Sequence, residues 1–152
     1  MAGRREFLQA GLAVSALPLV QSAFGHSGAP SLRESRATAT AEALVGFEVH
    51  KVIFDAELPE SRTFARDAMR LGLPALPFAG GDATDLWYHE LDPLWRRQPL
   101  AIAGLTRFGP LFVLERLAWD RGLRVLYRAE QERGPDPSVY SWVIGPRERE
   151  RA

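Results

Sequence analysis

The sequence contains no cysteine, and this absence excludes a whole group of sites. Without thiols the chain forms no disulfide, thiolate metal centre or iron–sulfur cluster, and it has no cysteine nucleophile. A net charge is also missing, because 19 Lys and Arg residues balance 19 Asp and Glu residues. No basic surplus remains to neutralise phosphates, so we expect no nucleic-acid partner. Lysine occurs once, at Lys51. The many arginines suit either carboxylate or phosphate clamps or a general compositional bias.

Several common catalytic motifs are missing as well. The chain has neither the His-Glu-x-x-His pattern of zinc proteases nor the Gly-x-Ser-x-Gly nucleophile elbow. Gly104 and Gly109 lie five residues apart and no Gly-Lys-Ser/Thr follows them, so they form no dinucleotide or P-loop fingerprint. The sequence therefore indicates no particular reaction and no particular cofactor.

The N-terminal residues carry a targeting pattern. Arg4 and Arg5 are followed by one polar residue, then by Phe7 and Leu8, and residues 7–20 form a weakly apolar run. This pattern resembles the twin-arginine (Tat) secretory leader, although Gly3 stands where Ser or Thr is usual. The resemblance implies recognition by the Tat translocase and a periplasmic location.

Small residues predict where such a leader would be cleaved. Ala23 and Gly25 suit the −3 and −1 positions of a signal peptidase site, so we expect residues 1–25 to be removed. The alternative is an uncleaved membrane anchor, but a spanning helix needs about 20 apolar residues, more than residues 7–20 supply. We therefore expect cleavage, with no stable membrane anchor afterwards. Residues 26–42 read as a flexible linker, residues 43–146 as the folded domain and residues 147–152 as a charged tail.

The domain alternates between apolar runs and amphipathic segments. A length of 152 residues with 46% hydrophobic residues suits one globular core. Pro74 and Pro77 place the second apolar run at a sheet edge, because proline removes a ladder donor. The pattern predicts strands at 44–56, 73–78, 100–105, 124–128 and 139–144, helices at 59–71 and 111–121, two short helical turns at 82–91 and from 92, and a polar loop at 129–138.

This order predicts an α/β fold. Repeated strand–helix alternation favours a single small three-layer domain with a mostly parallel sheet of four or five strands, flavodoxin-like or related. The last strand follows a loop instead of a helix, so it can join antiparallel. The stretch from Pro99 to Arg128 predicts a strand, a helix and a parallel strand at the centre of the fold.

Ligands of open α/β sheets bind at the carboxyl ends of the strands. That rule selects Asp55 and Glu57 after the first strand, residues 80–85 after the second, and Thr106, Arg107 and Gly109 after the third. The turn at residues 106–109 combines backbone N–H groups with an arginine before a helix, a pattern that suits a carboxylate or phosphate. An ordinary tight turn with a solvated arginine fits the same residues.

The segment between the second and third strands holds a second group of candidates. Asp85 and His89 lie four residues apart, so on a helical turn the carboxylate could orient the imidazole as a general base. Trp87 and Tyr88 could close over a ligand, or they could cover one face of the sheet. We thus expect Asp55, Asp85 and His89 as catalytic candidates, and Trp87, Tyr88, Thr106, Arg107 and Gly109 as ligand-binding candidates, with no metal site.

Three functions remain open from the residues. The leader and the missing catalytic motifs favour an exported small ligand-binding protein or an accessory subunit of an exported enzyme system. An enzyme acting on a small anionic substrate, with Arg107 holding the anion and Asp55 or His89 moving a proton, is the alternative. A metal carrier that uses His26 with His50 or His89 is the third.

Overall fold

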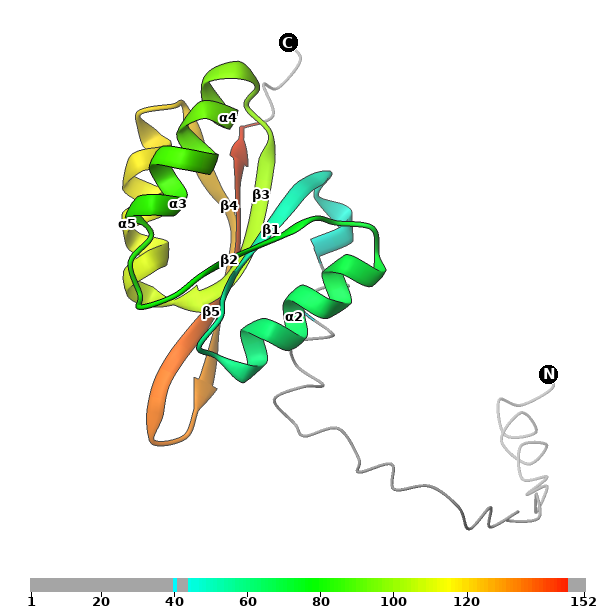
Figure 1. Cartoon of the computed structure of the whole chain (residues 1–152), viewed down its shortest axis with the longest axis vertical. Helices are drawn as coiled ribbons and strands as arrows, with labels where there is room; N and C mark the ends of the chain where they lie inside the picture. Colours follow the sequence, from blue (N-terminus) through cyan, green and yellow to red (C-terminus); the bar gives the residue numbers. More distant parts are fainter. Residues whose placement is uncertain (1–39, 41–43, 148–152) are drawn as a thin grey trace, which may run out of the picture.

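The computed structural model describes residue 40 and residues 44–147 (Figure 1). The predicted leader, most of the linker and the end of the charged tail lie outside these described residues. Along the chain the elements are η2 (Leu44–Gly46), β1 (Val49–Asp55), α2 (Pro59–Arg70), β2 (Ala75–Phe78), α3 (Thr84–Leu86), η3 (Trp87–Leu91), α4 (Asp92–Arg97), β3 (Ala101–Arg107), α5 (Phe108–Trp119), β4 (Leu123–Arg133) and β5 (Asp136–Pro146). The domain is α/β, as the strand–helix alternation predicts.

The five strands form one mixed sheet in the order β2-β1-β3-β5-β4. β1 pairs in parallel with β2 and with β3, whereas β5 pairs antiparallel with both β3 and β4. The prediction of a mostly parallel sheet therefore holds only for the first three strands. β4 does run in the same direction as β3, but β5 lies between them. The flavodoxin-like strand order, 2-1-3-4-5, is matched only as far as β3.

β4 and β5 form a long hairpin where the sequence predicts a polar loop at 129–138. Each strand has 11 residues, and the tip projects past the rest of the sheet (Figure 1). Gly134 takes the first turn position with a φ of +66° and Pro135 follows, as in two-residue hairpin turns that begin with glycine. The prediction was wrong because the projecting part has little core to face. Its side chains are polar on both sides and resemble a loop in composition.

Helices cover both faces of the sheet, which gives the predicted three layers. α2 packs on one face, and the α3–α4 segment and α5 pack on the other (Figure 1). The core on the α2 side contains Leu44, Val52, Leu58, Phe64, Ala68, Ala103, Leu105, Val139 and Val143. The core on the α5 side includes Ile53, Leu86, Trp87, Leu91, Trp95, Ile102, Leu111, Leu114, Leu123, Trp142 and Ile144. No helix among the described residues is long and apolar enough to cross a membrane.

β2 lies at the edge of the sheet, as its prolines predict. Val52 donates its N–H to the Pro74 carbonyl, and Ala56 donates to the Phe78 carbonyl. Because backbone groups alternate in direction along a strand, Pro77 faces away from β1. A ring without an N–H thus occupies the open edge, where it discourages pairing with another strand.

The helical backbone runs unbroken from Thr84 to Arg97, whereas the sequence predicts two separate turns. Its middle part, Trp87–Leu91, is a π-helical turn. In an ordinary α-helix the ring of Pro93 would clash with the carbonyl four residues earlier, and the wider turn relieves that clash. Asp92 therefore begins α4 without capping it.

Asp92 instead connects α4 to the end of α5. Arg121 donates its Nε to Asp92 Oδ1 at 2.7 Å, and Arg96 lies 3.0 Å from Asp92 Oδ2. Burial acts to raise the pKa of Asp92, but the hydrogen bonds and charges of Arg121 and Arg96 outweigh it and hold this pKa below its ordinary value of 3.8. The ionised Asp92 carboxylate thus stabilises the contact between α4 and the end of α5 at pH values above 3.8, and this stabilisation is lost as the pH falls through the lowered pKa.

At Gly104, the close packing between β3 and β5 leaves no room for a side chain larger than a hydrogen atom. Gly104 pairs with Trp142, and a Cβ at Gly104 would lie 2.3 Å from Trp142 Cζ2. Trp142 is fully buried and donates its indole N–H to the Thr106 hydroxyl at 3.0 Å. The indole therefore cannot move away without losing both its packing and its hydrogen bond.

We expect Gly104→Ala to lower the free energy of unfolding by about 1–3 kcal/mol or more, because the added methyl overlaps the Trp142 ring. Gly109→Ala is the matched control, since a Cβ there meets nothing within 4 Å and its φ is not positive. Urea denaturation of both variants measures the difference. Equal stability of the two variants would contradict the close packing of Gly104 against Trp142.

Candidate functional site

The carboxyl ends of β1 and β3 meet at the point where the chain changes faces. α2 follows β1 onto one face of the sheet, and α5 follows the neighbouring β3 onto the other. In open α/β sheets a crevice forms outside the strands at such a point, and ligands bind there. Asp55 ends β1 and Arg107 ends β3, so two of the predicted site residues meet at this position.

Asp55 is a fully buried carboxylate. Its Oδ1 accepts the N–H of Glu57 at 3.0 Å, and its Oδ2 lies 3.7 Å from Arg107 Nη1. Within the described residues Oδ2 accepts no hydrogen bond. Because burying a charge is costly without compensation, the nearby guanidinium of Arg107 favours this position for the carboxylate.

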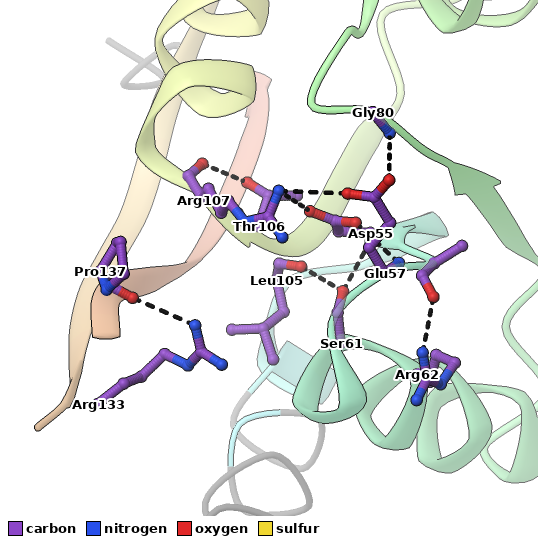
Figure 2. A network of polar contacts seen from close by, with 11 residues as sticks. Asp55, Glu57, Ser61, Arg62, Gly80, Leu105, Thr106, Arg107, Arg133 and Pro137 are labelled. Carbon is purple, nitrogen blue, oxygen red and sulfur yellow. Dashed lines mark hydrogen bonds and ion pairs between the residues drawn. The ribbon is translucent and has the colours of Figure 1, made fainter. Parts of the chain in front are cut away.

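Ser61 fixes the backbone around Asp55. Its hydroxyl oxygen accepts the Asp55 N–H at 2.8 Å, and the same hydroxyl donates to the carbonyl of Leu105 (Figure 2). Ser61 lies in the first turns of α2, so a single hydroxyl joins α2, β1 and β3. The end of β1 is thereby held against the end of β3.

Glu57 extends the cluster outward. Its Oε1 accepts the backbone N–H of Gly80 at 3.1 Å, and its Oε2 lies 3.4 Å from Arg107 Nη1 (Figure 2). The side chains of Glu57 and Arg107 are 48% and 38% exposed, so this part of the cluster faces solvent. Arg107 thus faces two carboxylates, those of Asp55 and Glu57, which together more than balance its single positive charge.

The predicted turn at residues 106–109 is not formed. β3 continues through Arg107 and α5 begins at Phe108, because a helix tolerates Pro110 in its first turn. Thr106 is fully buried, donates to the Arg107 carbonyl and accepts from Trp142, each at 3.0 Å. Its hydroxyl is therefore engaged inside the protein. Gly109 lies exposed in the first turn of α5.

His89 and Asp85 lie apart from this cluster, in a groove beside β2. The groove has a volume of about 500 Å³ and is lined by residues 76–79, 82, 85, 86, 89 and 90. His89 Nδ1 lies 3.0 Å from the backbone carbonyl of Asp85, so the carboxylate does not orient the imidazole as the spacing predicted. Asp82 accepts the Thr84 N–H at 2.8 Å, and hydrogen bonds from Thr84 lower the Asp82 pKa.

Trp87 and Tyr88, the two aromatic candidates of this segment, lie in different environments. Trp87 is buried and its ring packs edge-on against Trp95 at 5.8 Å, so it covers the sheet, which was the second interpretation of its sequence. Tyr88 is 64% exposed. Among the described residues no three His, Asp or Glu side chains gather in a way that could hold a metal ion. His50 is exposed at a register shift of β1, and His26 lies outside the described residues.

A second surface was missed by the sequence interpretation. Phe108, Phe112 and Trp119 follow one another at helical spacing along α5 and are 50%, 44% and 42% exposed; we call them the α5 aromatic stripe. In the sequence, Phe112 and Trp119 lie beside the apolar face formed by the leucines of this helix and would be expected to add breadth to it, but the structure leaves both exposed. The buried face is narrower, because Leu111, Leu114 and Ala118 already fill the space above the sheet.

Arginine side chains lie over the α5 aromatic stripe. The Arg116 guanidinium lies 5.3 Å from the Phe112 ring centroid and 4.6 Å from that of Trp119, and Arg124 lies 5.7 Å from the Trp119 centroid. Such stacking leaves the edges of a guanidinium available as hydrogen-bond donors. The stripe therefore combines apolar area with positive charge.

We expect Arg107→Gln to lower the free energy of unfolding by about 1–3 kcal/mol, because it leaves the buried Asp55 carboxylate without its cation. Adding Asp55→Asn should recover part of this loss, since no buried charge then remains. Arg70→Gln is the control, because Arg70 is 78% exposed in its pair with Asp67. Urea denaturation measures all four proteins, including the unsubstituted chain. An Arg107→Gln variant as stable as Arg70→Gln would contradict the role of Arg107.

Comparisons with known proteins identify no relative. A scan against protein-family models found no match, and searches of curated proteins and of solved structures found no significant similarity.

Proposed function

We propose that this chain is an exported accessory protein that binds a partner protein through the α5 aromatic stripe. The exposed row of aromatic side chains on α5 carries this proposal. Aromatic residues and arginine are enriched in the centres of protein interfaces, and large exposed apolar patches mark interaction sites. The twin-arginine pattern of Arg4 and Arg5 supports export, and such leaders serve proteins that cross the membrane folded, many of them with a partner.

The charges around the α5 aromatic stripe indicate what kind of partner fits. Arg116 and Arg124 place two positive groups over the exposed rings. A matching surface would offer an apolar centre with carboxylates around it, so that the guanidinium edges gain charge-assisted hydrogen bonds. We therefore propose an exported enzyme with an acidic rim as the partner.

The internal neutralisation of the site residues favours binding over catalysis. Arg107 faces Asp55 and Glu57, and the Thr106 hydroxyl is held between Trp142 and the backbone. In the anion-processing enzyme proposed as the alternative, the substrate would first have to displace the Glu57 carboxylate from Arg107. The accessory function needs no such rearrangement.

Export is tested by replacing Arg4 and Arg5 together with lysine and measuring the chain in periplasmic and cytoplasmic fractions. We expect the paired replacement to abolish periplasmic accumulation, because the leader pattern depends on the guanidinium pair. Arg33→Lys with Arg36→Lys, in the predicted linker, is the matched control. Unchanged periplasmic accumulation of the Arg4 and Arg5 variant would contradict Tat export.

Partner binding is tested with a photoreactive side chain at Phe112, and with the same group at Met69 as the control. Met69 is 51% exposed on α2, on the opposite face of the sheet. We expect one discrete adduct with a single exported enzyme from position 112 only. Arg116→Glu should reduce this adduct about tenfold by reversing the charge facing the acidic rim, while Arg66→Glu on α2 should not.

Three outcomes would contradict the docking proposal. The first is equal labelling from positions 112 and 69, which would show that the α5 face has no preference. The second is an adduct between two copies of this chain, which would make the stripe a self-association surface. The third is an adduct that Arg116→Glu leaves unchanged, which would remove the argument for an acidic partner.

A further inference from the structure

The Glu57 carboxylate is bound as an external ligand would be. One of its oxygens accepts the Gly80 N–H at 3.1 Å, and the other lies 3.4 Å from Arg107 Nη1. The donors come from the loop after β2 and from the end of β3, and both point to the carboxylate from outside its own segment (Figure 2). We propose that Gly80 and Arg107 form a receptor site for a small monocarboxylate anion, and that Glu57 occupies this site as an intramolecular ligand.

Arg107 has a second contact that does not depend on the Glu57 side chain. Arg107 is also held by the buried Asp55, whose Oδ2 lies 3.7 Å from the guanidinium. Asp55 in turn depends on Ser61 and on the backbone N–H of Glu57, and neither contact involves the Glu57 carboxylate. Displacement of that carboxylate would therefore leave Arg107 in place.

The loop that supplies the second donor is built around two glycines. Gly80 and Gly81 have φ angles of +69° and +68°, a backbone region that other residues rarely adopt. A Cβ at Gly80 would meet nothing within 4 Å, so conformation and not crowding requires glycine there. This conformation directs the Gly80 N–H toward the carboxylate, and the open space around it admits an external ligand.

The exposure of Glu57 indicates that an external anion can displace its carboxylate, and the charge of the site indicates which kind of anion fits. Its side chain is 48% exposed, and exposed ion pairs contribute little to stability. With Glu57 turned away, Arg107 and Asp55 cancel in charge, so a single negative charge restores the original balance. A small monocarboxylate matches the Glu57 group in charge, planarity and number of oxygens, whereas a doubly charged anion does not.

The site is distinct from the α5 aromatic stripe, although Phe108, the first residue of the stripe, directly follows Arg107. It lies at the carboxyl ends of β1 and β3, while the stripe lies on the exposed side of α5. It also differs from the anion turn predicted at residues 106–109, because Gly80 replaces that turn as the backbone donor. Either proposal can fail while the other stands.

The test is a titration of the ¹⁵N-labelled full-length chain with sodium acetate, following the Gly80 amide resonance. A tethered carboxylate competes at a high effective concentration, so its removal in Glu57→Ala should lower the half-saturating acetate concentration about tenfold or more. Glu48→Ala, an exposed glutamate at the other end of β1, should behave as the unsubstituted chain. Sodium chloride at equal ionic strength should give no saturable shift.

Further variants separate the receptor site from general effects on the fold. Glu57→Gln keeps the size of the side chain and removes its charge, so it should also bind acetate more tightly than the unsubstituted chain. Arg107→Lys in the Glu57→Ala background should weaken acetate binding, because the ammonium group cannot reproduce the guanidinium geometry.

The proposal is overturned if acetate gives no saturable Gly80 shift in either Glu57 variant, or if all proteins saturate at the same concentration. It is overturned as well if sulfate binds more tightly than acetate, since a doubly charged anion would then fit better.

Discussion

The buried carboxylate of Asp55 is the constraint on which this end of the molecule depends. A buried charge needs an opposite charge close by, and Arg107, at the end of the neighbouring strand β3, lies 3.7 Å from Asp55 Oδ2. This pair joins the end of β1 to the end of β3, and α2 follows directly after β1. Ser61 adds a hydrogen-bonded connection between the same three elements. The position where the chain changes faces is therefore also the position where charge is most tightly organised.

The same constraint links the fold to its proposed activities. Asp55 contacts Arg107 from inside the protein, and the Glu57 carboxylate contacts the same guanidinium from the outer side and also accepts the Gly80 N–H. A site preorganised in this way binds with little further ordering, which favours ligand binding without chemistry. On α5 the situation is the reverse. Leu111, Leu114 and Ala118 pack on the sheet, whereas the side chains of the α5 aromatic stripe remain 42–50% exposed.

Sequence patterns predicted the parts of this structure that depend on local chemistry. The alternation of apolar runs with helical segments located all five strands in order, and the prolines of β2 placed it at an edge because a missing N–H can be accommodated only there. Asp55, Glu57 and Arg107 were found by the rule that ligands meet the carboxyl ends of strands. The hairpin beyond Arg128 was missed, because polar side chains on both sides of a projecting ribbon give no amphipathic signal. Phe112 and Trp119 were misplaced, because an aromatic residue at helical spacing fits a buried face and an exposed one equally well.

The sequence by itself thus determined the α/β class, the order of the elements, the absence of thiol chemistry and the resemblance of residues 1–25 to a secretory leader, since each of these rests on residue type or short-range periodicity. The tertiary structure decided that β5 lies between β3 and β4, that Thr106 faces Trp142, and that Arg107 meets Asp55 and Glu57. Those outcomes depend on which segments are neighbours across the sheet. Strand order is set by the packing of distant residues such as Gly104 and Trp142, and no local pattern records it.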